Sequence, residues 1–300
     1  MKVLITGHLG FVGSHFYQAL LQEGGCVIST CDTATGPDDL PHHEPRDCRE
    51  GFENDAWQDM DLVIHCAATI PSIAEREANA LLVANDLSID SAMFQWAMRN
   101  QPRQIVMFSS SAAYPESLQH CEHYLTERDL DLDDYGPPSQ MYGLTKLVAE
   151  LQAREAKKLG IDIRVFRPFS GYGSDQSLNY PFRAFVERAR SRKAVFDIWG
   201  SGRQVRDFIH IDDIVEAVLT SIRQVDPGPL NLGTGIPTTM RELAELCVAA
   251  VPGYRPAFRV HDDKPEGSYF RCCDASMMRD FYIPKISLED GIRRAMENNT

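Results

Sequence analysis

The chain has 300 residues, of which 43% are hydrophobic and 24% charged, which is the composition of a globular protein and excludes a disordered, collagen-like or coiled-coil one. Asp and Glu outnumber Lys and Arg by 43 to 30, and the net charge of −13 disfavours general binding to nucleic acid or anionic membranes. No apolar run is long enough to span a membrane, and the N-terminus lacks a signal-peptide pattern. The 8 cysteines form no Cys-x-x-Cys pair, so we expect reduced thiols, no metal site and a cytoplasmic protein.

The first half of the sequence alternates short apolar runs with amphipathic segments. Apolar runs predict strands at 2–6, 26–31, 61–65, 104–108 and 162–166. Helical spacing predicts helices at 12–24, 77–100 and 141–159. This alternation predicts an α/β fold with a doubly wound, parallel sheet of the Rossmann type over residues 1–170.

The pattern becomes looser after residue 170. Further helices are expected at 181–192, 211–223, 239–250 and 287–297, with loops rich in Gly, Pro and aromatic residues between them. We therefore expect residues 171–300 to form mainly a smaller, C-terminal substrate-binding lobe. The chain is expected to return to the first domain at about 204–232.

A glycine-rich loop follows the first strand directly and opens the next helix. It runs from Gly7 through Gly10, Phe11 and Val12 to Gly13. Glycines at these positions allow a tight turn and let backbone amides approach a pyrophosphate at the helix N-terminus. The order strand, loop, helix predicts a dinucleotide site, although a purely structural turn gives the same pattern.

Asp32 stands at the end of the second predicted strand, where a dinucleotide fold places an acid. A carboxylate there accepts hydrogen bonds from the adenosine ribose hydroxyls and repels a 2′-phosphate. No Lys or Arg lies between Val3 and Pro45 to neutralise such a phosphate. The sequence therefore favours NAD over NADP, unless Asp32 is only a solvated turn residue.

Tyr142 and Lys146 are four residues apart, which places a phenol and an ammonium on one face of the helix predicted at 141–159. A free tyrosine has a pKa near 10, but a neighbouring cation favours its phenolate. Tyr142 can then accept a proton from an alcohol while hydride leaves for the cofactor. This spacing alone is common on helices. The catalytic interpretation therefore depends on the glycine loop that precedes the pair in the sequence.

Three consecutive serines, from Ser109 to Ser111, follow the strand predicted at 104–108. Substrates of such folds bind at the carboxyl ends of the strands. A serine hydroxyl there can hold the reacting oxygen against Tyr142. The alternative is an ordinary polar loop.

These motifs together resemble the extended short-chain dehydrogenase/reductases, and among them the NAD-dependent epimerase/dehydratase family that acts on nucleotide sugars. The resemblance covers almost the whole length, with its motifs in the family's order. Besides the glycine loop, the serines and the Tyr/Lys pair, it rests on His65-Cys-Ala-Ala68, Asn85, Arg167-Pro-Phe-Ser-Gly-Tyr-Gly173, Arg206-Asp-Phe-Ile-His-Ile-Asp-Asp213 and Asn231-Leu-Gly-Thr-Gly235.

The resemblance implies roles for further residues. Ser110 would be the catalytic hydroxyl beside Tyr142, and Lys146 would also hold the nicotinamide ribose. Besides the glycine loop, Asp32, Tyr142 and Lys146, the residues expected to bind NAD are Asp47, Cys48, Ala67, Ala68, Asn85 and Pro168. The residues expected to bind the nucleotide-diphosphate sugar are Ser111, Asn179, Arg206, Lys264 and Arg271.

Some of these assignments have alternatives. Arg206 can instead be an ion-pair partner of Asp207 or Asp212. Ser170 stands where the family often has Asn, so the sugar phosphate can be held differently. The family's members often form homodimers through the helices here expected near 85–100 and 141–159, and we expect a homodimer.

The reaction is inferred from the loop after the catalytic hydroxyl. In this family a 4,6-dehydratase carries an Asp-Glu pair there and a uronic acid decarboxylase a Glu, whereas this chain has Ser111 and Ala112. The resemblance thus favours C4 epimerisation through a transient 4-keto intermediate. A dehydratase, reductase, synthase or decarboxylase remains the alternative, as does a dinucleotide-binding protein without catalysis, although such proteins typically lose the Tyr or the Lys.

Overall fold

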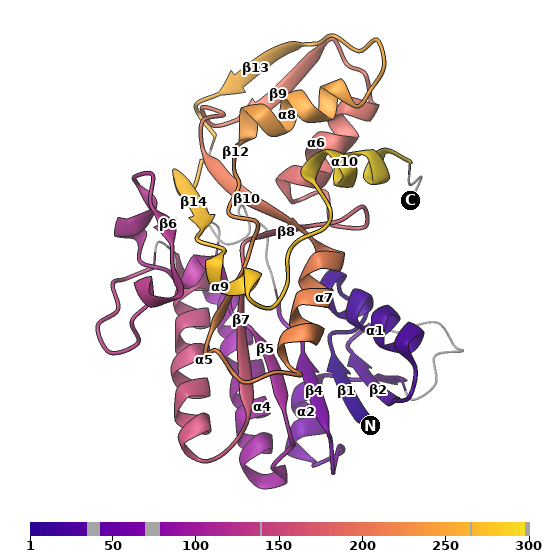
Figure 1. The fold of residues 1–300 in the computed structure, drawn as a ribbon, viewed down its shortest axis with the longest axis vertical. Coiled ribbons are helices and arrows are strands. Elements are labelled where there is room, and N and C mark those ends of the chain that lie inside the picture. The colour runs from indigo at the N-terminus through magenta and orange to yellow at the C-terminus, as the bar shows by residue number, and fades with distance from the viewer. Residues whose placement is uncertain (35–42, 70–78, 139, 265, 298–300) are drawn as a thin grey trace. The chain divides into compact units, whose positions relative to one another are not determined.

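The computed structural model describes residues 1–34, 43–69, 79–138, 140–264 and 266–297. The chain forms two compact units, coloured along the sequence in Figure 1. The first consists of Met1–Ala113, Leu132–Arg167 and Ile222–Leu230, and the second of Tyr114–Asp131, Pro168–Ser221 and Asn231–Thr300. Tyr114–Asp131 thus joins the second unit although it precedes residue 170, and the return to the first unit is shorter than 204–232.

The first unit is built on a sheet with the strand order β11-β7-β5-β4-β1-β2-β3, in which every pairing from β7 to β3 is parallel. The strands are β1 (Lys2–Thr6), β2 (Val27–Asp32), β3 (His43–Pro45), β4 (Leu62–His65), β5 (Ile105–Phe108), β7 (Ile163–Pro168) and β11 (Leu230–Leu232). The chain reverses its direction of growth between β1 and β4, which is where ligands bind in such sheets. The predicted Rossmann-type fold is confirmed.

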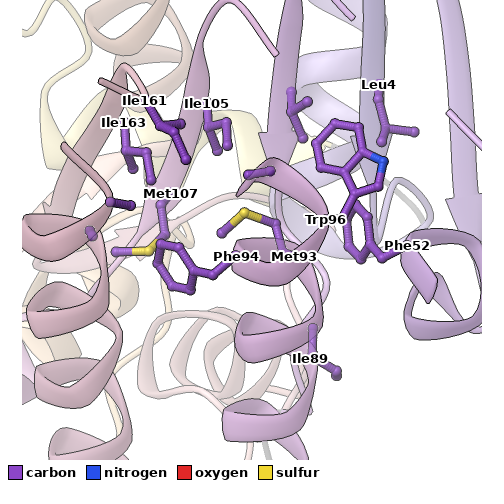
Figure 2. Close-up of a cluster of buried hydrophobic side chains, with 14 of the residues drawn as sticks. Leu4, Phe52, Ile89, Met93, Phe94, Trp96, Ile105, Met107, Ile161 and Ile163 are labelled. Carbon is purple, nitrogen blue, oxygen red and sulfur yellow. The ribbon is translucent and has the colours of Figure 1, made fainter. Parts of the chain in front are cut away.

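Helices cover both faces of this sheet. They are α1 (Phe11–Glu23), α2 (Cys48–Glu53), α4 (Ala84–Asn100) and α5 (Met141–Lys158), with a 3₁₀ turn η1 (Ala80–Val83) before α4. On one face, side chains of α2, α4 and α5 pack with alternate residues of the strands in the cluster of Figure 2. On the other face, Phe16 of α1 contacts Phe108 of β5, with ring centroids 5.6 Å apart. Burial on both faces explains why the strands are continuous apolar runs.

Two short elements, β3 and α2, lie between residues 43 and 53. β3 pairs with β2 in parallel, and α2 begins at Cys48 because the Asp47 side chain caps it by accepting a hydrogen bond from the Arg49 backbone N–H at 2.9 Å. Both elements are short, so neither has a periodic signal. The helix predicted at 77–100 is found as the turn η1 followed by α4. Residues 77 and 78 of the predicted helix lie outside the described part.

The second unit contains a sheet with the order β12-β10-β14-β6, β8 beside β10, and a separate pair of strands, β13 and β9. Its strands are β6 (Tyr124–Leu125), β8 (Ser170–Tyr172), β9 (Val195–Trp199), β10 (Val205–His210), β12 (Pro237–Thr239), β13 (Ala257–His261) and β14 (Phe270–Cys273). Its helices are α6 (Pro181–Arg190), α7 (Ile211–Ser221), α8 (Met240–Ala249), α9 (Ser276–Arg279) and α10 (Leu288–Glu297). A search of the described residues for a helix long and apolar enough to cross a membrane finds none.

Candidate active site

The glycine loop joins β1 to α1 in a form that only glycine permits. Gly7 has φ +67°, and a Cβ there would lie 2.7 Å from the backbone N of Ala67. A Cβ on Gly13 would lie 2.3 Å from the carbonyl oxygen of Gly7, so the helix starts directly against the loop. Gly10 is the N-cap of α1, and no side chain caps this end. The backbone N–H groups of the first turn, from Phe11 and Val12 onward, thus suit an anionic pyrophosphate.

Asp32 closes this loop from the end of β2. Its carboxylate accepts hydrogen bonds from the backbone N–H groups of Leu9 at 3.0 Å and Ala34 at 3.1 Å. Each carboxylate oxygen has a further lone pair, so the group can also accept from ribose hydroxyls. Arg46, the first Lys or Arg after Lys2, donates its backbone N–H to the Asp32 carbonyl oxygen at 2.8 Å. The glycine loop and Asp32 together fit the pyrophosphate and ribose of a dinucleotide.

Asp47 and Asn85 are joined by Arg49, a residue that the sequence motifs did not single out. The Arg49 side chain donates to the Asp47 carboxylate at 2.5 to 3.0 Å, and these bonds lower the pKa of Asp47. It also donates to Asn85 Oδ1 at 3.1 Å and to Ser88 Oγ at 2.7 Å. The only sequence signal that could have indicated Arg49 is its position two residues after Asp47, the aspartate that caps α2. Contact of Asp47 and Asn85 with NAD stays a prediction.

The other residues expected at the cofactor occupy different environments. Cys48 is buried in the cluster of α2 and α4, and burial raises the pKa of its thiol to about 12. Ala67 donates its backbone N–H to Thr6 Oγ1 at 3.3 Å, beside the glycine loop, and Ala68 is exposed. Pro168 is the last residue of β7. Their contacts with NAD also stay predictions.

The three serines after β5 divide into different roles. Ser109 is buried and donates to Glu150 Oε1 at 2.5 Å, so its hydroxyl is part of the framework. Ser111 is buried at the start of a 3₁₀ turn, η2 (Ser111–Ala113). Ser110 is half-buried and its hydroxyl accepts from the backbone N–H of Ala112 at 3.1 Å, which leaves its hydrogen free to donate to a ligand.

Tyr142 and Lys146 lie in the first turns of α5, which packs against the serine loop. A Cβ on Gly143 would lie 2.1 Å from the carbonyl oxygen of Ala112, so the helix and the loop touch at this point. The Nζ of Lys146 is 6.0 Å from the centroid of the Tyr142 ring. Tyr142 is half-buried, whereas Lys146 is 6% exposed. The helix thus carries a phenol with a buried cation beside it.

The charge of Lys146 is supported by acids. Burial alone lowers the pKa of Lys146, but Asp90, Tyr142 and Asp86 raise it more, so its pKa lies above the ordinary value. The side chain is therefore an ammonium at neutral pH. A phenol and a charged ammonium on one face of a helix are groups that acid/base chemistry at an alcohol can use.

In the second unit, Arg206 and Arg271 lie side by side. They are register partners in the parallel pairing of β10 with β14. Arg206 donates to the carbonyl oxygens of Val205 at 2.7 Å and Ser268 at 2.8 Å, and Arg271 donates to Ser268 Oγ at 2.6 Å. Burial lowers the pKa of Arg206 to about 10, which still leaves it charged at neutral pH. Two adjacent guanidinium groups suit a phosphate or diphosphate.

The ion pair of Arg206 with Asp207 or Asp212 is not found among the described residues. Asp207 is buried and accepts from Thr234 and Gly235 at 2.7 to 2.9 Å, while Asp212 pairs with Arg294 at 3.5 Å.

The remaining residues expected at the substrate are exposed. Lys264 pairs with Asp263 at 3.7 Å, and Asn179 lies just before the N-cap of α6. Their contact with substrate stays a prediction.

Comparisons with known proteins show the family to which the chain belongs. A model of the NAD dependent epimerase/dehydratase family matches residues 3–233. GDP-mannose 3,5-epimerase 1 of Oryza sativa subsp. indica is 29% identical over 98% of this chain and 80% of its own length. GDP-L-fucose synthase of Escherichia coli is 25% identical over 97% of this chain and 94% of its own length. The structure of UDP-glucuronic acid 4-epimerase from Bacillus cereus with UDP-glucuronic acid and NAD has a TM-score of 0.85 at 23% identity, and covers 99% of this chain and 98% of the other. The chain belongs to the NAD dependent epimerase/dehydratase family, whose extended short-chain dehydrogenase/reductase fold and NAD cofactor its sequence motifs had indicated.

Proposed function

We propose that the chain is a nucleotide-sugar epimerase that inverts C4 through a transient 4-keto intermediate. The observation that carries this proposal is the first-unit constellation of Ser110, Tyr142 and Lys146. The loop beside it has Ser111 and Ala112 where dehydratases of the family hold their acid and base. A sequence relative named as a 3,5-epimerase supports epimerisation, and a structural neighbour named as a 4-epimerase supports inversion at C4.

The residues of the first unit would have the following roles in the reaction. Bound NAD would supply the acceptor for the C4 hydride. The first-turn amides of α1 would bind its pyrophosphate, Asp32 would accept hydrogen bonds from its adenosine ribose, and Lys146 would bind the nicotinamide ribose. Ser110 donates a hydrogen bond to the C4 oxygen. Tyr142 accepts the proton of the C4 hydroxyl during oxidation and returns it to the oxygen after the ketone has been reduced from the other face.

We further propose that Arg206 and Arg271 hold the diphosphate of the substrate. Their neighbouring guanidinium groups can bind phosphate oxygens in bidentate fashion. The proposal does not specify the nucleotide of the substrate, because two of the relatives are named for GDP-sugars and the Bacillus cereus structure for a UDP-sugar. A substrate screen must therefore include both nucleotides.

We also propose that the chain forms a homodimer through α4 and α5. A groove of about 500 Å³ between these helices is lined by Phe94, Met98, Leu151 and Leu159 among others. Met98 is 48% exposed and Leu159 64%, which is unfavourable for large apolar side chains in water. The same two helices of a second copy would cover this apolar face.

Asp32 predicts a preference between cofactors. NAD should bind at least about tenfold more tightly than NADP, on the order of 1.4 kcal/mol, because the carboxylate repels a 2′-phosphate. Titration calorimetry on nucleotide-free protein measures both affinities. Asp32→Asn should narrow the difference between the affinities for NAD and NADP. Equal affinities of the unaltered protein would refute the role of Asp32.

An isotope experiment separates C4 epimerisation from dehydration. Elimination of water requires loss of the proton at C5, whereas C4 epimerisation only moves hydride from C4 and back. The reaction is run in D₂O, and the labile hydroxyl and amide positions are then exchanged back in H₂O. The product should keep the mass of the substrate and gain no carbon-bound deuterium, as read by mass spectrometry and NMR. A product lighter by one water would identify a dehydratase, and deuterium at C5 without loss of mass would indicate epimerisation at C5.

A further inference from the structure

A buried glutamine contacts one of the two arginines proposed to hold the diphosphate. Gln119 is the last residue of a 3₁₀ turn, η3 (Glu116–Gln119), and is fully buried. Arg271 donates its Nε–H to Gln119 Oε1 at 2.6 Å. Neither the sequence motifs nor the reaction above gives Gln119 a role. A buried amide is costly unless it is hydrogen-bonded, so its partners indicate what it does.

The amide of Gln119 can face Arg271 in only one way. Its Nε2 donates to the backbone carbonyl oxygens of Tyr114 at 3.0 Å and Pro115 at 3.3 Å. Those carbonyls only accept hydrogen bonds, and a guanidinium only donates them. A flipped amide would turn its oxygen to the two carbonyls and its NH₂ group to the arginine, and all three bonds would be lost. The oxygen of Gln119 is therefore fixed toward Arg271.

The segment that carries Gln119 is itself attached to the second unit on both sides of this residue. Tyr114 is buried, and its hydroxyl donates to the buried Asn231 Oδ1 at 2.7 Å. Further along the segment, β6 pairs in parallel with β14, the strand that contains Arg271 (Figure 1). Gln119 lies between these two attachments, so its place beside Arg271 is fixed by the backbone as well.

Gln119 and Ser268 together determine the orientation of the Arg271 guanidinium. Its Nη2 donates to Ser268 Oγ at 2.6 Å, while its Nε donates to Gln119. A guanidinium is planar, so two acceptors on different nitrogens determine its plane. The Ser268 carbonyl oxygen also accepts from Arg206 at 2.8 Å, which connects the neighbouring guanidinium to the same residue. A side chain that is ordered in advance loses less conformational entropy when a ligand binds.

The chemical nature of Gln119 suits a neighbour of an anion-binding arginine. An amide oxygen accepts a hydrogen bond without carrying a charge. A carboxylate in the same place would form an ion pair with the guanidinium and compete with a phosphate for it. Gln119 thus orients the guanidinium of Arg271 without neutralising it.

We propose that Gln119 is a positioning residue that holds Arg271 in the orientation in which it binds the diphosphate of the substrate. The proposal rests on the proposed function, which assigns the diphosphate to Arg206 and Arg271. Without the oxygen of Gln119, the diphosphate itself would have to order the guanidinium, so binding would weaken. The reacting carbon is not involved, so the change should appear in KM rather than in kcat.

A double-mutant cycle on nucleotide binding tests this role. Titration calorimetry with GDP, UDP, dTDP and CDP on the full-length protein with NAD bound identifies a diphosphate that binds. Gln119→Met should weaken its affinity by about tenfold. In protein that already carries Arg271→Met, the same substitution should change the affinity by less than about twofold, because no guanidinium remains to be oriented. Loss of the bonds to the Tyr114 and Pro115 carbonyls occurs in both backgrounds and cancels in the cycle.

Gln104→Met is the matched control. The Gln104 side chain also donates to a backbone carbonyl oxygen, that of Ile222 at 3.2 Å, and to Asp162 at 2.9 Å. It directly precedes β5, at the amino end of the sheet, whereas ligands bind at the carboxyl ends of such strands. Its loss should leave the affinity within about twofold of the unaltered protein.

The proposal is overturned if Gln119→Met binds the nucleotide like Gln104→Met, or if it weakens binding equally with and without Arg271→Met. The second result would show that Gln119 has a structural role only. If the unaltered protein binds none of the four diphosphates, the diphosphate site of the proposed function fails, and this inference fails with it. The two failures are thus distinguished by the unaltered protein.

NMR of protein carrying ¹⁵N-labelled arginine tests the contact without any change at Gln119. Arg271→Met identifies the Nε–H signal of Arg271 by its disappearance. In the unaltered protein this hydrogen should exchange with water at least about tenfold more slowly than the Nε–H of Arg293, which is 67% exposed, because it is bonded to a buried oxygen. Exchange as fast as that of Arg293 would overturn the proposal even if Gln119→Met fails to fold.

Kinetics supply a further readout. With a nucleotide sugar that is turned over, Gln119→Met should raise KM by about tenfold and leave kcat within about threefold. A fall in kcat at unchanged KM would overturn the proposal, because it would place Gln119 in the chemical step or in the general stability of the site. If no nucleotide sugar is turned over, the proposed reaction fails, and the nucleotide titrations still decide the role of Gln119.

Discussion

Replacement of Tyr142 by phenylalanine should lower turnover of a nucleotide sugar by roughly 10²–10⁴, the usual range for loss of a general acid/base. The substitution removes only the hydroxyl and keeps the half-buried ring, so folding and NAD binding should persist. Turnover is measured by NMR of the sugar, NAD binding by calorimetry, and stability by urea denaturation. Ser110→Ala should cost less, because Ser111 or water can partly replace the hydrogen bond to the C4 oxygen.

Tyr135→Phe is the control for this variant. Tyr135 also carries a phenol in the first unit, but it is 48% exposed and precedes α5. Its loss should leave turnover within about twofold of the unaltered enzyme, since surface substitutions rarely matter by more than about 0.5 kcal/mol. Near-normal turnover of Tyr142→Phe would show that another group moves the proton.

Replacement of Arg167 by methionine should destabilise the protein by about 3–5 kcal/mol, the cost of breaking a buried ion pair. Arg167 of β7 and Glu150 of α5 are each 1% exposed, and two hydrogen bonds of 2.9 and 2.7 Å join them. Ser109 donates to the same carboxylate. Loss of the guanidinium leaves this carboxylate buried and without its cation, which raises the free energy of the folded state.

Urea denaturation measures this effect, and Arg293→Met provides the comparison. Arg293 pairs with Asp290 at 2.5 Å, but the two side chains are 67% and 43% exposed, so its loss should cost about 0–1 kcal/mol. Combining Arg167→Met with Glu150→Gln should recover part of the lost stability, because no buried charge then remains. A cost below about 1 kcal/mol for Arg167→Met would mean that water solvates Glu150 once the arginine is gone.

The parts of the fold that follow from local pattern are the parts that the sequence predicted. β1 and β4 are continuous apolar runs because helices cover both faces of their sheet. Such a run can be recognised in a single sequence. The glycine loop is similar, since Gly7 and Gly13 stand where any Cβ would meet backbone. Tyr142 and Lys146 were found because one turn of helix fixes their spacing.

Features that depend on long-range contacts could not be found in this way. β6 has two residues and exists only because it pairs with β14, far along the chain, so the membership of Tyr114–Asp131 in the second unit gave no local signal. Asp86 and Asp90 look like a solvated face of α4, because nothing in their own helix shows that both are buried in the folded chain. The contact of Arg49 with Asn85 could not be predicted either, because it depends on the placement of α2 against α4.

The most direct test of the account is to offer the purified protein, with its bound NAD measured, a panel of GDP-, UDP-, dTDP- and CDP-sugars, and to follow each by NMR and mass spectrometry. The account predicts that at least one member is converted to a second nucleotide sugar of the same mass that differs in configuration at C4. NMR is essential, because epimers have equal mass. NAD-containing protein that converts no member, or a product that has lost water, would contradict it.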